Sequence, residues 1–204
     1  ATAIAEHFRD AGQQVLLMMD SLTRFAMAAR EIGLARGEPA TTKGYTPSVF
    51  GGLPGLVERP GRHGSGRTKG VNTVLVEGDD LDDPVADALR AILDGHVVLS
   101  RELAERGHFP AVDPLASVSR AMEIVASSEH KQLAIRLRRL LAAYRDAQDL
   151  IQVGAYAAGS DPDVDQAIAR RSAIEQFLRQ ETRSVRTIAE SLAGMRTALQ
   201  GATK

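Results

Sequence analysis

The sequence predicts an α/β fold followed by an all-helical region. Three short apolar or β-branched runs alternate with amphipathic helical patterns in the first part of the chain. This alternation is typical of a parallel sheet with crossover helices. After about residue 125 the strand patterns disappear and helical spacing continues. We therefore expect an α/β domain over residues 1–125 and a helical domain over residues 126–204.

The first elements follow from apolar spacing and from glycine and proline. An amphipathic helix is predicted over residues 2–11 and ends at Gly12. The run "QQVLLMMD", residues 13–20, is apolar on both faces, which predicts a buried strand of a parallel sheet. Three further elements follow on the same signals, namely helix 22–35, loop 37–47 and helix 48–58.

Two more strands and a capped helix complete the α/β part. The stretch "VNTVLVEG", residues 71–78, is rich in β-branched residues and predicts a second strand. Asp83 is predicted as the cap of a helix that has Pro84 in its first turn and Gly95 at its end. The stretch "HVVLSR", residues 96–101, predicts a third strand, followed by a short helix.

The last part reads as helices only. Residues 131–151 have helical apolar spacing, and Asp161 and Pro162 predict the cap and first turn of the next helix. Alternating three-and-four spacing predicts one last helix with a single apolar stripe, which is either a docking surface for a partner or packed on its own domain. The stripe comprises Leu178, Val185, Ile188, Leu192, Met195 and Leu199.

Composition excludes several classes of protein. The 204 residues include 25 basic and 26 acidic side chains, so net charge gives no reason to expect nucleic acid or an anionic membrane as a partner. The chain has no cysteine, hence no disulfide or thiolate metal site. No apolar run reaches the roughly 20 residues of a membrane span. Because the chain begins inside a helical pattern, we expect it to be part of a longer protein.

The stretch "GRHGSGRTKG", residues 61–70, is close to a phosphate-binding loop but lacks its context. Arg67 stands where that motif has lysine, and the stretch follows a predicted helix and precedes a predicted strand. A phosphate loop joins a strand to a helix, so that N–H groups and the helix N-terminus converge on the phosphates. We therefore expect a mobile basic surface loop here.

Other polar clusters indicate little chemistry by themselves. In the acidic stretch 77–83 a calcium loop starting at Asp79 would need glycine and glutamate where Pro84 and Arg90 stand. The five histidines lack zinc-ligand spacing. Three arginines of "IRLRRL" are expected on a solvated helix face, with an RNA-contacting stripe as the less favoured alternative. They are Arg136, Arg138 and Arg139.

Asp20 is the strongest candidate from the residues alone, because it ends the first apolar strand. A carboxylate at the C-terminal edge of a parallel sheet commonly holds Mg²⁺ through water beside a nucleotide. A buried strand can also end in aspartate without any such function.

Three long blocks, residues 16–50, 76–120 and 149–168, closely resemble the flagellar and type III secretion export ATPases. More distantly, they are similar to the catalytic subunits of rotary ATP synthases, and the resemblance covers residues 1–180. It implies a RecA-like nucleotide-binding domain followed by a helical domain.

The resemblance also assigns roles to four residues. It implies that Asp20 is the Walker B acid, acting on Mg²⁺ through water, and that Arg24 in "DSLTR" supports that region. Phe109 in "GHFPAVDP" falls where the family stacks an aromatic ring, more commonly tyrosine, on adenine. Arg120 in "SVSR" falls at the arginine finger, which a subunit supplies to its neighbour's ATP. Without the resemblance, core packing for Phe109 and a surface ion pair for Arg120 would be the default.

The implied activity is ATP hydrolysis with Mg²⁺ at the subunit interfaces of a hexameric ring, which energises protein export. The implied partners are like subunits, a central stalk protein, a regulatory stator, and export chaperones and substrates, without nucleic acid. The implied location is the cytoplasm, peripheral to the inner-membrane export gate. The family's phosphate loop and catalytic glutamate lie upstream of Ala1, so we expect this chain alone not to hydrolyse ATP.

Two other functions stay open at this point. A non-catalytic subunit of a rotary ATPase has the same core, although Phe109 and "EGDD" favour the catalytic type. A RecA-like nucleic-acid translocase is less favoured, because charge is nearly balanced and aromatics are few. The sequence does not separate a flagellar system from an injectisome.

Overall fold

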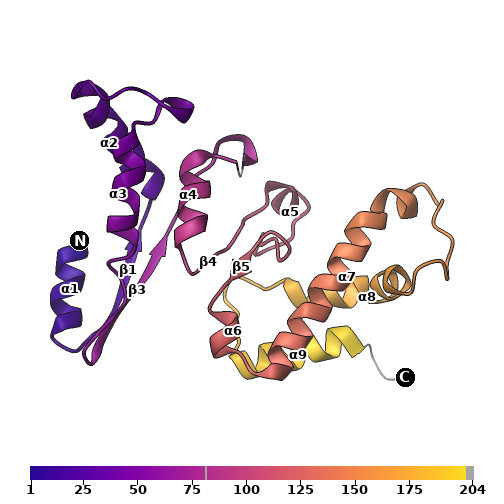
Figure 1. The fold of residues 1–204 in the computed structure, drawn as a ribbon. Coiled ribbons are helices and arrows are strands. Elements are labelled where there is room, and N and C mark those ends of the chain that lie inside the picture. The colour runs from indigo at the N-terminus through magenta and orange to yellow at the C-terminus, as the bar shows by residue number, and fades with distance from the viewer. Residues whose placement is uncertain (81, 201–204) are drawn as a thin grey trace. The chain divides into compact units, whose positions relative to one another are not determined.

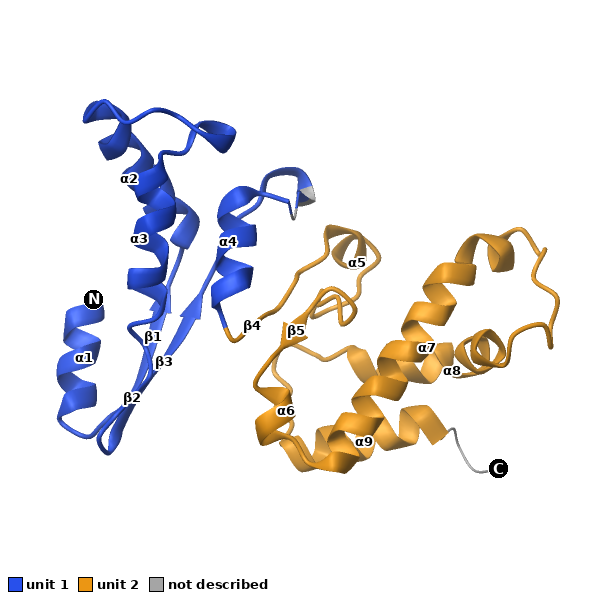
Figure 2. Ribbon diagram, viewed as in Figure 1, with its two compact units in different colours: residues 1–93 blue, residues 94–204 orange. Residues whose placement is uncertain are grey.

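A computed structural model describes residues 1–80 and 82–200 of the chain, which divides into two compact units. Unit 1 comprises residues 1–93 and unit 2 comprises residues 94–204 (Figure 2). Each unit has its own apolar core. The division into compact units at 93/94 does not test the domain boundary predicted at 125/126, which stays a prediction.

Unit 1 combines a small sheet with helices, as the alternating pattern predicts (Figure 1). Strand β1 is parallel to β3, in register from Gln14 opposite Arg67 to Met19 opposite Asn72, and β2 forms an antiparallel hairpin with β3. The helices are α1 (Thr2–Asp10), α2 (Leu22–Ala35), α3 (Pro47–Val57) and α4 (Pro84–Ile92), with short 3₁₀ turns η1 (Thr42–Gly44) and η2 (Glu77–Asp79). The strands are β1 (Gln14–Met19), β2 (Arg62–His63) and β3 (Gly66–Asn72).

The partner strand of β1 lies earlier in the sequence than predicted. Residues 71–78 were predicted as the second strand, but β3 spans Gly66–Asn72, so most of the basic stretch 61–70 is hairpin and strand, not a surface loop. Gly66 passes so close to α1 that a Cβ atom would lie 1.9 Å from the carbonyl oxygen of Arg9. Strand formation here depends on non-local pairing with β1 and on close approach, which local propensity does not report. The stretch still joins a helix to a strand and therefore lacks the geometry of a phosphate loop.

The prediction that β1 is a buried strand is only half right. Its alternate residues are half-buried, whereas Leu16 and Met18 are 61% and 71% exposed. An apolar run on both faces is typical of a strand covered on both sides. Within the described residues, only one face of β1 is covered.

The core of unit 1 joins three helices. Leu22, Leu53 and Leu89, one each from α2, α3 and α4, are fully or almost fully buried. Gly33 of α2 lies against the chain before α3, because a Cβ atom there would come within 2.4 Å of the Thr46 hydroxyl. This packing positions the N-terminus of α2, which begins directly after β1.

Unit 2 is mainly helical (Figure 1). Helices α7, α8 and α9 share one core that includes Leu137, Leu140, Ile174 and Leu199. The predicted third strand, residues 96–101, is wrong for most of its length, since only a two-residue strand and one isolated bridge form there. The elements are β4 (Gly95–His96), α5 (Arg101–Glu105), β5 (Val118–Ser119), α6 (Met122–Val125), α7 (Ser128–Gln152), α8 (Pro162–Leu178) and α9 (Ile188–Gln200).

Helix caps were predicted correctly, but the last helix was not. The carboxylates of Asp83 and Asp161 accept hydrogen bonds from the first N–H groups of α4 and α8. The single last helix is instead two elements: α8 ends at Leu178, and Val185, in the connection to α9, is 92% exposed. The apolar spacing continues across this break although the backbone of Arg179 is extended. Spacing of apolar residues alone therefore does not reveal where the helix ends.

Across the described residues, none of the helices has the length and apolar character needed to cross a membrane. The same residues contain no group of three or more His, Asp or Glu side chains placed to hold a metal ion.

Substituting Gly66→Ala should destabilise unit 1 by about 1–3 kcal/mol, because the new methyl group meets backbone that cannot move away by a rotamer change. Gly51→Ala is the matched control: Gly51 lies within α3 with open space around its Cβ position, and alanine there should stabilise by about 0.5–1 kcal/mol. Urea unfolding of both variants measures the two shifts. Equal stability of the two variants would contradict the close approach of β3 to α1.

Candidate functional site

Asp20 lies immediately after β1, where its side chain is anchored and the backbone of neighbouring residues is held by hydrogen bonds. The Thr73 hydroxyl donates a hydrogen bond of 2.6 Å to Asp20 Oδ1. The backbone of Thr73 donates to the carbonyl of Met19 and accepts from the N–H of Leu22, which fixes the hydroxyl beside the carboxylate. Asp20 is exposed, and within residues 1–80 and 82–200 no protein group donates to its second carboxylate oxygen. One oxygen is therefore oriented and the other is open to a ligand or water.

The turn from β1 into α2 is held by buried hydroxyl groups. Ser21 caps α2 by accepting the N–H of Arg24. The Thr23 hydroxyl accepts the N–H of Leu75 at 2.8 Å and donates to its carbonyl at 3.2 Å, continuing the contact between the segments after both strands end. Arg24 is exposed on the first turn of α2.

Sequence reasoning missed two partners in unit 1. Thr73 was placed inside a strand, although a hydroxyl near the end of the neighbouring parallel strand is a usable signal for a partner of Asp20. Lys43 was placed in a loop, and its ammonium lies 2.5 Å from Asp80 and 3.6 Å from Asp83. The hydrogen bond with Lys43 holds the pKa of Asp80 below its ordinary value and raises the pKa of Lys43. The acids at and beside the cap of α4 are thus partly paired with Lys43.

Phe109 presents its ring to solvent from an anchored backbone in unit 2. Its side chain is 57% exposed, which excludes a core position within the described chain. Its carbonyl accepts the N–H of Gln180, and the N–H of the preceding His108 donates to the carbonyl of Leu103. His108 is buried, and burial, with a smaller contribution from the charge of Arg179, lowers the pKa of its imidazole. Phe109 therefore follows a buried histidine and is itself exposed.

Arg120 directly follows the short strand β5. Its N–H donates a hydrogen bond of 2.8 Å to the carbonyl of Asp94, which extends the pairing of β5 with β4 by one residue. Gly95 in β4 allows this approach, because a Cβ atom there would lie 2.6 Å from the carbonyl oxygen of Val118. The backbone at Arg120 is fixed, and its side chain is exposed.

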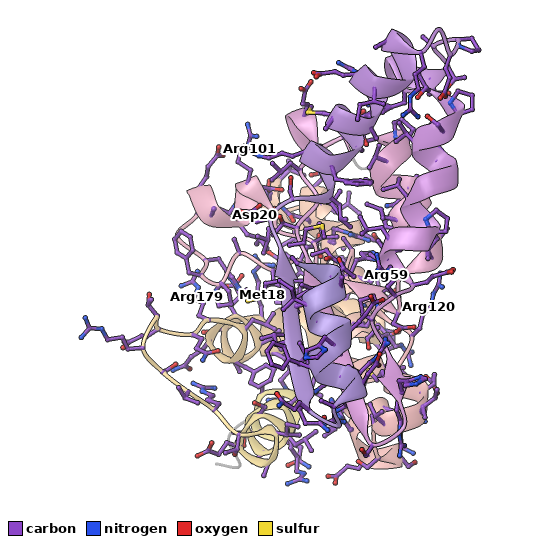
Figure 3. All side chains as sticks on the ribbon, turned by 90° about the vertical axis from the view of Figure 1, so that its left-hand side faces the viewer. Met18, Asp20, Arg59, Arg101, Arg120 and Arg179 are labelled. Atoms are coloured by element: carbon purple, nitrogen blue, oxygen red, sulfur yellow. The ribbon has the colours of Figure 1, made fainter. Side chains whose placement is uncertain are left out.

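The four predicted site residues are thus divided between the units. Asp20 and Arg24 lie on one strand-to-helix turn of unit 1, and Phe109 and Arg120 lie on two anchored segments of unit 2. Figure 3 labels Asp20 at the end of the strand that carries Met18. Their roles in catalysis and nucleotide binding stay predictions.

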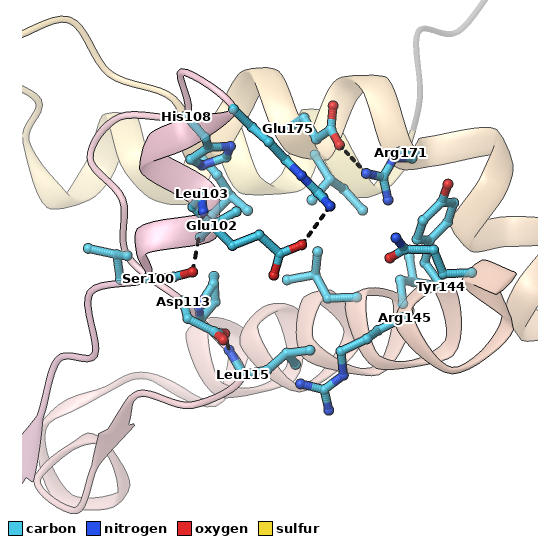
Figure 4. Close-up of a pocket in the computed structure, with 18 of the residues that line it drawn as sticks. Ser100, Glu102, Leu103, His108, Asp113, Leu115, Tyr144, Arg145, Arg171 and Glu175 are labelled. Atoms are coloured by element: carbon cyan, nitrogen blue, oxygen red, sulfur yellow. Dashed lines mark hydrogen bonds and ion pairs between the residues drawn. The ribbon is translucent and has the colours of Figure 1, made fainter. Parts of the chain in front are cut away.

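Unit 2 also contains a cavity of about 220 Å³ that the sequence did not indicate (Figure 4). It lies among α5, the segment 112–115, α7 and α8, and none of the four predicted site residues lines it. Ion pairs Glu102–Arg106 and Arg171–Glu175 lie at its wall, and Arg171 stacks on the ring of Tyr144 at 3.7 Å. Four of the charged side chains at the cavity are therefore paired with one another, and Asp113 and Arg145 also line it.

Both parts of the chain match models of known protein families. Residues 1–119 match the model of the ATP synthase alpha/beta family, nucleotide-binding domain. Residues 126–197 match the C-terminal domain of the type III secretion ATPase EscN. The flagellum-specific ATP synthase of Bacillus subtilis (strain 168) is 53% identical over 201 residues, covering 98% of this chain and 46% of the relative.

Two solved structures of EscN from enteropathogenic E. coli have the same fold. The assembled ATPase has a TM-score of 0.92 and 46% identity, covering 97% of this chain and 48% of that chain. EscN in complex with its central stalk EscO has a TM-score of 0.86 and 45% identity, covering 98% of this chain and 47% of that chain. The chain thus spans about half the length of the relatives it matches. From the family model over residues 1–119 and the agreement in fold, we conclude that this chain belongs to the ATP synthase alpha/beta family, on the branch of the flagellar and type III secretion ATPases.

Proposed function

We propose that this chain is the C-terminal part of a protein-export ATPase that hydrolyses ATP at the subunit interfaces of a ring. The observation that carries the proposal is Asp20, whose carboxylate is oriented by Thr73 at the end of a parallel strand and keeps one oxygen open. In nucleotide-binding α/β folds, ligands bind at this edge of the sheet. The exposed apolar face of β1, with Leu16 and Met18, fits a longer protein in which further chain covers it.

The residues present fit ATP and Mg²⁺. Asp20 would hold the ion through water, since a single open carboxylate oxygen suits the water-rich coordination of Mg²⁺. When bound, the ion offsets negative charge on the phosphates. Arg24, one turn into α2, would support this region. Phe109 would stack on adenine, because more than half of its side chain is exposed while its backbone is held on both sides.

Arg120 would act as an arginine finger on ATP held by the neighbouring subunit. Phosphoryl transfer needs charge stabilisation more than covalent help, and a finger contributes about 10³ to 10⁵ in rate. A finger must be presented from a fixed backbone and be accessible to the neighbouring subunit. The N–H of Arg120 is hydrogen-bonded, and the residue is exposed. This role makes the site dependent on ring assembly.

The proposed assembly is a hexameric ring with a central stalk, a regulatory stator, and export chaperones and substrates as partners. The ring and the stalk are supported by the likeness to assembled EscN and to its complex with EscO. The domain boundary at 125/126 is supported by family models that end at residue 119 and begin at residue 126. We place the protein in the cytoplasm, at the inner-membrane export apparatus. The non-catalytic and nucleic-acid alternatives are less favoured by the relatives.

The chain by itself should show no Mg²⁺-dependent ATP hydrolysis, because the family's phosphate loop and catalytic glutamate precede the matched region. The same sequence within its longer protein should hydrolyse ATP at ring-forming concentrations. Phosphate release, measured on both proteins with and without Mg²⁺, tests the difference. Hydrolysis by the short chain, or tight nucleotide binding without turnover in the long one, would contradict the proposal.

Substituting Arg120→Ala in the longer protein should lower turnover by about 10³-fold or more while leaving ring formation intact. Arg139→Gln is the control, since Arg139 pairs with Asp163 on the exposed side of α7 and should be neutral. A second measurement mixes Arg120→Ala subunits with Asp20→Asn subunits, each inactive alone. Because a finger acts on the neighbouring site, mixed rings should regain activity, and a lack of recovery would count against a shared site.

A further inference from the structure

The segment between Asp113 and Ser117 leads directly into β5 and Arg120, and its backbone carbonyls all have partners. The carbonyl of Asp113 accepts from both the N–H and the hydroxyl of Ser117. The carbonyl of Ala116 lies 3.1 Å from Nε2 of His96 in β4. The Asp113 carboxylate accepts the N–H groups of Leu115 and Ala116, so the turn is also closed from within.

The remaining three carbonyls of this segment are bound by a single side chain. Arg138 of α7 donates from Nη1 to the carbonyls of Pro114 and Ser117, the latter at 2.9 Å. It donates from Nη2 to the carbonyl of Leu115 at 2.9 Å. Arg138 was expected on a solvated helix face, and although it is exposed, its guanidinium is engaged with backbone. The neighbouring arginines are different, because Arg139 and Arg136 face α8.

This contact closes a short loop around Arg120. The chain leaves Ser117, passes through β5, Arg120 and α6, and returns on α7 to Arg138. The ammonium of Lys131 joins α6 to α7 as well, through the carbonyl of Glu123 at 2.5 Å. Arg120 therefore lies between the β4–β5 pair on one side and a segment tied to α7 on the other.

We propose that Arg138 is the positioning residue of the arginine finger: its guanidinium fixes the segment 114–117 to α7 and so sets the place of Arg120 relative to the helical part of the chain. The inference rests on the proposed role of Arg120 and deepens it. Two β5 residues give little stiffness by themselves, so the register of Arg120 depends on what holds the turn before it. Arg138 supplies donors from two nitrogens in a planar fork, which a lysine ammonium cannot reproduce in the same geometry.

The link also gives α7 a way to act on the site. A movement of α7 relative to β4 would pull on three carbonyls within six residues of Arg120. Small misplacements of a catalytic group cost large factors in rate, about 10²-fold for 1 Å. Export ATPase activity would therefore depend on the position of α7 through Arg138.

The test is a double-mutant cycle in the longer protein, with turnover measured by labelled phosphate release so that residual rates stay above background. Arg138→Gln should lower kcat by about tenfold to a hundredfold and leave the KM for MgATP within about twofold. Arg138→Lys should recover only part of the rate. Arg138→Gln combined with Arg120→Ala should be no slower than Arg120→Ala alone, because the first residue acts only through the second. Arg139→Gln, one residue along the same helix, should leave kcat unchanged.

Amide hydrogen exchange gives a readout that does not depend on activity. In Arg138→Gln the amide of Arg120 should exchange about tenfold faster, while core amides of α7 around Leu137 and Leu140 stay as protected as before. Loss of protection throughout α7 would mean that the variant disturbs the fold, and it would overturn a positioning role.

The outcomes separate the two hypotheses. Full activity of Arg120→Ala would contradict the proposed role of Arg120 as an arginine finger. The hydrogen-exchange data would still report whether Arg138 holds the segment 114–117. Loss of activity in Arg120→Ala with normal turnover in Arg138→Gln overturns the positioning role alone. Additive losses in the double variant overturn it as well, because Arg138 would then act elsewhere.

Discussion

The structure depends on one constraint: backbone N–H and carbonyl groups beyond the ends of its strands must find partners outside a regular ladder. The paired strands of unit 2 are two residues long, and β1 ends at Met19 just before its candidate functional residue. In each case side chains supply the missing hydrogen bonds, as Thr23 does for Leu75 and Arg138 does for Leu115. Each such hydrogen bond contributes modestly to stability, and together they hold the loops in one conformation.

Hydrogen bonding of the backbone by side chains suits a site whose candidate reactive groups are exposed. Asp20, Phe109 and Arg120 are exposed, yet hydrogen bonds tie the backbone of Phe109, of Arg120 and of the residues next to Asp20. An exposed side chain on a fixed backbone can meet a ligand or a neighbouring subunit without first being ordered, which lowers the entropic cost of binding. A catalytic site completed across a subunit boundary requires this property, since each subunit must present its part before the partner is in place.

Several local features were predictable because they depend on a few neighbouring residues. Helix α2 was predicted with its observed bounds, and Asp83 and Asp161 were predicted as caps. The failures share a different cause. The strand at Gly66–Asn72 is formed by pairing with β1, and the break after Leu178 interrupts an apolar spacing that continues across it. In both cases contacts distant in sequence outweigh local preference.

The sequence by itself determined the α/β-then-helical order, the helix caps, the family resemblance, and the choice of Asp20, Arg24, Phe109 and Arg120 as candidates, because motifs and periodicity are properties of neighbouring residues. Only the tertiary structure decided which side chains hold those candidates. Thr73 reaches Asp20 across 53 positions, and Arg138 reaches Ser117 across 21. Hydrogen bonds of this kind depend on where separate elements come to lie, and that arrangement is set by packing and strand pairing rather than by any local pattern.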